Sequence, residues 1–193
     1  MTLRFLGAIG IFCGSNFGAT QAFANGARAL GRVLGEANIS VVYGGTTKGL
    51  MGVVADAALA AGGSVHGVIT DSLHRRGHSH DRLSQHEIVP TLRVRKSRMV
   101  ELADAFIAMP GGLGTVEELM EVWSMNQLSE IDKPLGLLNT AGYFDPFLDF
   151  IDHMVNTKFL PATHRESVSV DADPRVLLEK LRNYTRVDAP KWL

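Results

Sequence analysis

The sequence of 193 residues contains one cysteine, Cys13, so no disulfide can form within the chain. Cys13 lies in an apolar run, and nothing near it in the sequence would lower its pKa, so we expect a buried, unreactive thiol. A chain without disulfides suits a reducing compartment, and we therefore expect a cytoplasmic protein.

An excess of charge of one sign is also lacking, since 19 Lys and Arg residues stand against 20 Asp and Glu residues. A net charge of −1 creates no global field that would attract nucleic acid or a membrane surface. No apolar run is as long as a membrane span, and the first residues lack the small-residue cleavage site of a signal peptide. We expect neither nucleic acid nor a membrane as a partner.

Short apolar runs alternate with segments of helical period, a pattern typical of a parallel sheet covered by helices on both faces. The hydrophobic content of 46% supports one sizeable core, and the chain contains no repeat and no linker. We therefore predict a single α/β domain over residues 1–193 with an open parallel sheet. The predicted strands are 5–12, 39–43, 64–69, 87–89, 105–109 and 134–138.

The predicted helices cover 20–36, 48–61, 92–103 and 113–127, with two more near the end of the chain. Gly35 lies near the end of the first of them, as expected of a helix stop signal. Asp145 and Asp173 each precede a proline, so each carboxylate is predicted to cap a helix that begins at that proline.

The segment 71–86 is irregular, polar and rich in histidine. It is either a mobile loop over the site or a metal-binding segment, since His78 and His80 form an H-x-H array beside Asp81. Only part of a ligand set is present, so we expect no metal site.

Three glycine-rich turns each follow the carboxyl end of a predicted strand. The first contains Gly14 and Ser15, the second contains Gly44 and Gly45, and the third spans 110–115. Because such ends share one edge of an open parallel sheet, the three turns are predicted to line one ligand pocket.

The third turn has the features of a phosphate site. Gly111, Gly112 and Gly114 leave backbone N–H groups open to an anion, and the next helix points its positive end at the same place. Thr115 adds a hydroxyl donor. Glycines also occur wherever a strand turns sharply into a helix, so a structural role is the alternative.

Charged residues on the two flanking helices favour a ligand site. After the third turn, Glu118 and Glu121 share one helix face, and the preceding helix carries Arg95 and Lys96. Both helices flank one strand, so the acidic and basic groups are predicted to approach the same crevice. A solvated charged face is the alternative for the basic run.

At these residues the chain resembles the LOG proteins, the cytokinin riboside 5′-monophosphate phosphoribohydrolases. Arg95-Lys96 and the segment 110–118 are similar to the family signature R-K followed by P-G-G-x-G-T-x-x-E. Similarity continues through 104–108 and 133–139, and spans residues 5 to about 155. Bacterial members were often labelled "lysine decarboxylase".

The resemblance implies a Rossmann-like sheet in a homodimer that cleaves AMP or N6-substituted AMP without a dissociable cofactor. Arg95 and Glu118 would be the catalytic pair. The other residues of the expected site would bind the substrate. They are Ser15, Gly44, Gly45, Lys96, Gly111, Gly112, Gly114, Thr115 and Glu121. We expect Met99, Met120, Trp123 and Met125 to pair the two protomers.

Two departures from the family pattern concern the base pocket. Members often have M-H-E-R-K where this chain has 92–96, and T-W-x-Q-L where it has 124–128. The resemblance therefore specifies the reaction more closely than the substrate. A non-catalytic nucleotide-binding carrier or sensor is the alternative function. Lysine decarboxylation needs a pyridoxal phosphate lysine, and none of the six lysines is in an evident cofactor setting.

Overall fold

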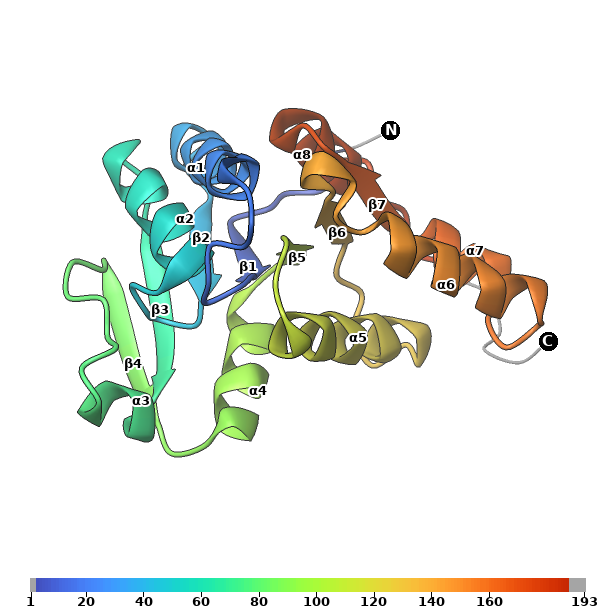
Figure 1. Ribbon diagram of the computed structural model, residues 1–193. Helices are drawn as coiled ribbons and strands as arrows, with labels where there is room; N and C mark the ends of the chain where they lie inside the picture. The colour runs from blue at the N-terminus through green and yellow to red at the C-terminus, as the bar shows by residue number, and fades with distance from the viewer. Residues whose placement is uncertain (1–2, 188–193) are drawn as a thin grey trace.

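The computed structural model describes residues 3–187, which build one seven-stranded sheet in the order β4-β3-β2-β1-β5-β6-β7 (Figure 1). All neighbouring strands are parallel. The strand order reverses between β1 and β5, and ligands of open α/β sheets bind outside such a switch point. The strands are β1 (Ala8–Phe12), β2 (Ser40–Tyr43), β3 (Val65–Thr70), β4 (Gln85–Val89), β5 (Ala105–Ala108), β6 (Leu135–Leu138) and β7 (Val168–Asp171).

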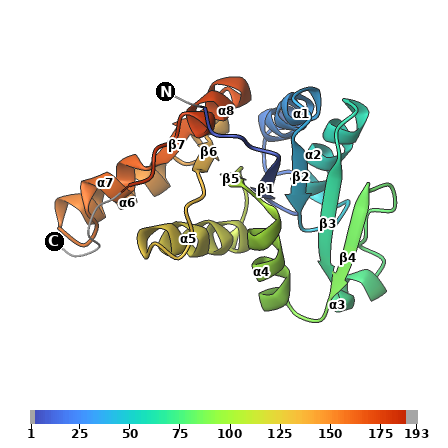
Figure 2. The same cartoon turned by 180° about the vertical axis from the view of Figure 1, so that it is seen from behind.

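Helices cover both faces of the sheet, as the alternating pattern predicts (Figures 1 and 2). One hydrophobic cluster joins the sheet to α1 (Gln21–Glu36), α2 (Gly49–Ala60) and α8 (Pro174–Arg182). A second cluster joins the opposite face to α4 (Leu92–Leu102), α5 (Leu113–Gln127) and α6 (Asp145–Asn156). The shorter elements are α3 (Asp71–Arg75), the 3₁₀ turn η1 (Thr140–Gly142) and α7 (Ala162–Glu166).

The predicted fold class is confirmed, and some boundaries differ from the prediction. The first strand begins at Ala8, while Phe5 is 86% exposed. The segment 71–86 contains α3 and the start of β4, so it is not a plain loop. The seventh strand, β7, was not predicted, because its sequence VSVD is short and half polar. No helix within residues 3–187 has the length and apolarity that crossing a membrane requires.

The predicted end of the first helix is confirmed, since α1 ends at Glu36, and Gly35 near that end is buried where its backbone packs against α2. One prediction about a helix end is wrong. The first residue of α6 is Asp145, and its Oδ1 accepts a hydrogen bond from Asn139 Nδ2 at 2.7 Å instead of capping the helix. The prediction for Asp173 is confirmed, since its Oδ1 accepts from the backbone N–H of Arg175 at 2.7 Å.

Close packing of α1 on α2 depends on Gly31. A Cβ at this position would overlap the backbone carbonyl oxygen of Val54 and lie 2.8 Å from Ala57 Cβ. The small residues along both helices thus let the two backbones approach each other. This contact fixes the position of α2, the helix that follows the second glycine turn.

We expect Gly31→Ala to lower the free energy of unfolding by about 1–3 kcal/mol, because the overlap outweighs the gain in helix propensity. The matched control is Gly114→Ala in α5, where a Cβ would meet no atom within 4 Å and stability should not fall. Urea denaturation measures both. Equal stability of Gly31→Ala and the unsubstituted protein would contradict this packing role.

Candidate active site

Backbone hydrogen bonds join the first glycine turn to the third turn and to α2, the helix that follows the second turn. The Gly14 N–H donates to the Pro110 carbonyl at 3.0 Å, and the Leu50 N–H donates to the Gly14 carbonyl at 3.0 Å. The three turns line a cavity of about 720 Å³. The prediction that they share one pocket is therefore confirmed.

The start of α5 offers this cavity an uncapped helix end. Its N-cap, Gly112, makes no side-chain capping bond, and the first turn of the helix contains no acidic residue. The first N–H groups of a helix have no partner within it, so they are available to an anion. Both Gly112 and Gly114 line the cavity and have open space where a Cβ would stand. Packing does not require glycine at either position, and the missing side chains leave the backbone open to the cavity.

Arg95 reaches the cavity from α4 across the second turn. Its Nε donates to the Val68 carbonyl at 3.0 Å, and its guanidinium occupies the space where a side chain at Gly44 would begin. Glycine at 44 therefore lets the guanidinium lie against the backbone. Burial lowers the Arg95 pKa, and the charge of Glu118 opposes that effect.

Glu118 faces the same cavity from α5, one turn after the uncapped helix end. Burial raises its pKa from 4.5 to about 7, and the charge of Arg95 partly offsets this rise. Among the described residues, no Arg95 nitrogen forms an ion pair with Glu118 within 4.0 Å. The two groups thus influence each other's charge without forming an ion pair, and both line the cavity.

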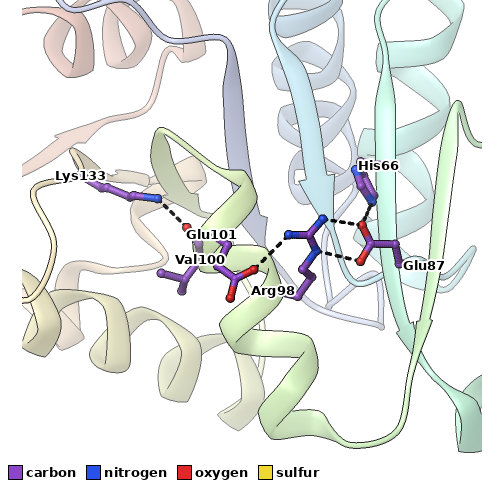
Figure 3. A network of polar contacts seen from close by, with 6 residues as sticks. All are labelled: His66, Glu87, Arg98, Val100, Glu101 and Lys133. Atoms are coloured by element: carbon purple, nitrogen blue, oxygen red, sulfur yellow. Dashed lines mark hydrogen bonds and ion pairs between the residues drawn. The ribbon is translucent and has the colours of Figure 1, made fainter.

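A polar network fixes the helix that carries Arg95 (Figure 3). Arg98 of α4 binds both oxygens of Glu87 on β4, at 2.8 and 3.0 Å, and His66 Nε2 lies 2.9 Å from Glu87 Oε1. The Arg98 hydrogen bond is the main cause of the lowered Glu87 pKa. At the carboxyl end of α4, Lys133 Nζ donates to the carbonyl groups of Val100 and Ala103, each at 2.6 Å. The network holds α4 in place on the sheet.

The structure brings most of the predicted site residues to the cavity. Those that line it are Ser15, Gly44, Arg95, Gly111, Gly112, Gly114, Thr115 and Glu118. Gly45, Lys96 and Glu121 are not among its lining residues. Lys96 Nζ lies 3.0 Å from Glu121 Oε2 and also binds Glu117, so it links α4 to α5 outside the cavity.

Aromatic and apolar lining residues were not predicted. Phe23 belongs to the apolar stripe of α1, yet its ring lines the cavity and meets Tyr143 edge-on, with centroids 5.6 Å apart. The Tyr143 hydroxyl donates to the Gly111 carbonyl and so supports the third turn. The remaining large lining residues include Phe17, Met51, Leu73, His78 and Met99. The sequence around each of them does not indicate a role in the site. These residues come from segments far apart in sequence, and only folding brings those segments to one cavity.

The histidine-rich segment is attached to the cavity wall. His80 is buried, and its Nε2 lies 3.1 Å from Asp56 Oδ1 on α2, away from Asp81. Within residues 3–187, no group of three or more His, Cys, Asp or Glu side chains could hold a metal ion. Cys13 lines the cavity as a buried thiol, and burial raises its pKa, as expected.

Comparison with known proteins gives one family. Residues 51–181 match the family described as "Possible lysine decarboxylase". The chain is 42% identical over 175 residues to the rice protein "Probable cytokinin riboside 5'-monophosphate phosphoribohydrolase LOGL2", covering 91% of this chain and 72% of that protein. It is 40% identical over 174 residues to "Cytokinin riboside 5'-monophosphate phosphoribohydrolase LOG1" of Arabidopsis thaliana, covering 90% and 82%.

Solved structures share the fold at lower identity. The molybdenum cofactor binding protein of Rippkaea orientalis superimposes with a TM-score of 0.69 at 22% identity, covering 91% of this chain and 95% of that one. The molybdenum cofactor carrier protein of Chlamydomonas reinhardtii gives 0.69 at 19% identity, covering 90% and 96%. At this identity the likeness concerns the Rossmann-like fold alone.

The raised pKa of Glu118 predicts a pH-dependent stability. A carboxyl with a pKa of about 7 when folded and 4.5 when unfolded stabilises the protein fully below 4.5, and this contribution is lost as the pH rises through 7. Glu118→Gln, which mimics the neutral form, should therefore be more stable than the unsubstituted protein at pH 8 by up to about 3 kcal/mol. Urea denaturation of both proteins at pH 8 and near pH 4.5 should show that the difference in free energy of unfolding disappears at the lower pH. The exposed control Glu130→Gln should show no such trend, and a constant difference for Glu118→Gln would refute the shift.

Proposed function

We propose that this chain, which belongs to the LOG family, hydrolyses the N-glycosidic bond of AMP or of an N6-substituted AMP. The products are the free base and ribose 5-phosphate. The observation that carries the proposal is the placement of Glu118 and Arg95 across one cavity, beside the uncapped glycine turn of α5. The chain's relatives named as phosphoribohydrolases match it over nine-tenths of its length.

The charges suit the chemistry of glycosidic cleavage. As the base departs with the bonding electrons, the sugar acquires positive charge, which a carboxylate at Glu118 stabilises. The same carboxylate orients the attacking water and accepts its proton, and the departing base takes up one proton, so the two transfers balance. Arg95 positions the ribose phosphate and keeps part of the Glu118 population ionised near neutral pH.

The phosphate fits the start of α5. Gly111, Gly112 and Gly114 present backbone N–H groups, Thr115 adds its hydroxyl, and the helix dipole favours a dianion. Each charge-assisted hydrogen bond is worth roughly 1.5–3 kcal/mol. Binding the phosphate away from the bond to be cleaved also holds the ribose in its reactive position.

The cavity does not fit the cofactor that lysine decarboxylation requires. That reaction uses pyridoxal phosphate bound to a lysine as an imine, with an acidic partner for its ring nitrogen. Among the described residues, the lysine that lines the cavity is Lys48, which is exposed at the N-cap of α2. The charged groups at the centre are instead Arg95 and Glu118.

A homodimer is part of the proposal, on a set of residues that keeps Met120 from those first expected but not Trp123 or Met99. Trp123 and Met99 are only 5% and 1% exposed, because they pack in the core of their own chain. Exposed apolar side chains nevertheless lie on α4, on α5 and at the C-cap of α5. They are Leu92, Val94, Leu113, Met120 and Leu128. Leu113 also lines the cavity, so pairing of these helices would place the two cavities near the interface.

We also propose that the protein works in the cytoplasm. Its one cysteine, Cys13, is buried as a free thiol, which suits a reducing compartment.

The purified protein should release adenine from AMP, and Glu118→Gln should reduce kcat by about 10²–10⁴-fold, because both the water and the sugar charge lose their carboxylate. In the unsubstituted protein kcat/KM should fall below about pH 7, where Glu118 becomes protonated. Chromatography of free adenine measures both. The control Glu130→Gln should turn over normally. Near-normal turnover by Glu118→Gln would show that the reaction does not need this carboxylate.

Adenosine should be a far poorer substrate than AMP, because it leaves the N–H groups of the third turn without an anion. Loss of two charge-assisted hydrogen bonds predicts a kcat/KM about two to four powers of ten lower. Thr115→Ala should reduce the ratio of kcat/KM for AMP to kcat/KM for adenosine, because it weakens AMP cleavage more than adenosine cleavage. Equal kcat/KM for the two substrates would show that the glycine turn is only structural.

Sedimentation at micromolar concentration should give twice the mass of one chain. Leu92→Glu, at a side chain that is 58% exposed on α4, should shift the protein towards the monomer, because a charge would be buried at the interface. Val176→Glu on the distant α8, where the side chain is 45% exposed, is the matched control and should stay dimeric. A monomeric mass for the unsubstituted protein would exclude the dimer.

A further inference from the structure

Three successive carbonyl groups of the third glycine turn accept hydrogen bonds. The Pro110 carbonyl accepts from the first glycine turn at 3.0 Å, and the Gly112 carbonyl accepts from the Val116 N–H at 3.2 Å. The Gly111 carbonyl between them accepts a hydrogen bond from the Tyr143 hydroxyl. Three separate donors thus fix the direction of three neighbouring peptide groups.

The peptide bond between Gly111 and Gly112 takes its orientation from Tyr143. Glycine has no side chain, so a peptide between two glycines can turn over with few steric restrictions. A trans peptide is planar, and its C=O and N–H groups point in opposite directions, so a donor that holds the carbonyl also sets the direction of the N–H. Among residues 3–187, the Gly112 N–H makes no backbone hydrogen bond, and Gly112 lines the cavity. The Tyr143 hydroxyl thus holds this N–H on the opposite side of the peptide, free for a ligand.

The side chain of Tyr143 is itself held in place. Its ring packs edge-on against Phe23 of α1 and against Phe144, with centroid distances of 5.6 and 5.1 Å. Its backbone N–H donates to the Thr140 carbonyl of η1 at 3.2 Å. The next N–H, that of Phe144, donates to Asn139 Oδ1 at 2.7 Å. The hydroxyl therefore reaches the third turn from a segment whose backbone and ring are both fixed.

We propose that Tyr143 is a positioning residue for the substrate phosphate, an inference that rests on the proposed nucleotide hydrolysis. A carbonyl oxygen carries partial negative charge and repels a phosphate, whereas an N–H group attracts it. By holding the Gly111 carbonyl, the hydroxyl prevents this peptide from turning its oxygen towards the phosphate. The hydrogen bond also polarises the peptide, which strengthens the Gly112 N–H as a donor. Tyr143 thus acts on the phosphate through the peptide between them.

Equilibrium binding separates this role from general support of the cavity wall. Tyr143→Phe keeps the ring and its contacts with Phe23 and Phe144 but lacks the hydroxyl. In a Glu118→Gln background, which slows turnover, adding Tyr143→Phe should weaken binding of AMP and of ribose 5-phosphate about tenfold, by calorimetry. Adenosine, which lacks the phosphate, should bind as before. The control Tyr184→Phe removes a hydroxyl outside the cavity and should change none of these affinities.

The amide resonance of Gly112 reports the orientation of the peptide directly. In protein labelled with nitrogen-15 glycine, saturating inorganic phosphate should move this resonance downfield, because the N–H donates to an anion. Its absence from the spectrum of Gly112→Ala gives the assignment, and the fold accommodates that variant because a Cβ there meets no atom within 4 Å. In Tyr143→Phe the shift should be clearly smaller, because part of the population presents the carbonyl instead. Glycine resonances outside the cavity should stay in place and show that the fold is intact.

The outcomes distinguish positioning of the phosphate from a structural role. Equal loss of AMP and adenosine binding in Tyr143→Phe would overturn the proposal, and so would no loss of either. An unchanged Gly112 shift with phosphate in Tyr143→Phe would also overturn it. Failure of the proposed hydrolysis would appear separately, as AMP left intact by the unsubstituted protein, because neither measurement needs turnover.

Discussion

Two opposite charges held in one partly buried cavity without direct contact are the constraint on which the rest of the structure depends. Arg95 and Glu118 each bear a cost of burial, visible in the lowered pKa of the first and the raised pKa of the second. Direct pairing would reduce that cost but would close the gap that a substrate needs. The fold keeps them apart by anchoring Arg95 to the Val68 carbonyl and by tying α4 to β4 through Arg98 and Glu87.

The glycines around the cavity serve two different needs. Gly44 and Gly111 are required by the fold, because the Arg95 guanidinium and the Thr115 hydroxyl occupy the space of their missing side chains. Gly112 and Gly114 have open space around them, so the fold would accept a methyl group at either position. In the proposed function, the substrate phosphate that approaches the backbone accounts for those two. The same motif thus combines packing requirements with binding requirements, and a sequence pattern does not separate them.

Charges close together in sequence also differ in what they contact. Arg95 and Lys96 are neighbours, yet only Arg95 lines the cavity, while Lys96 links the acidic side chains of α5. Likewise Glu118 lines the cavity and Glu121 does not. Successive residues of a helix point about 100° apart, so small differences in helix rotation decide which charge enters the cavity. Trp123 illustrates the same limit, since it was expected at a protomer interface and lies in the core.

The sequence by itself determined the α/β class, six of the seven strands, the three glycine turns and the resemblance to the LOG family, because these depend on local periodicity and on short ordered motifs. The tertiary structure decided what depends on contacts between distant segments. Folding placed Phe23, Tyr143 and His78 on one cavity with Glu118. The pairing of His80 with Asp56, and not with its neighbour Asp81, attached the histidine-rich segment to α2. Burial and the field of distant charges set the pKa of Glu118, and neither quantity exists until the chain has folded.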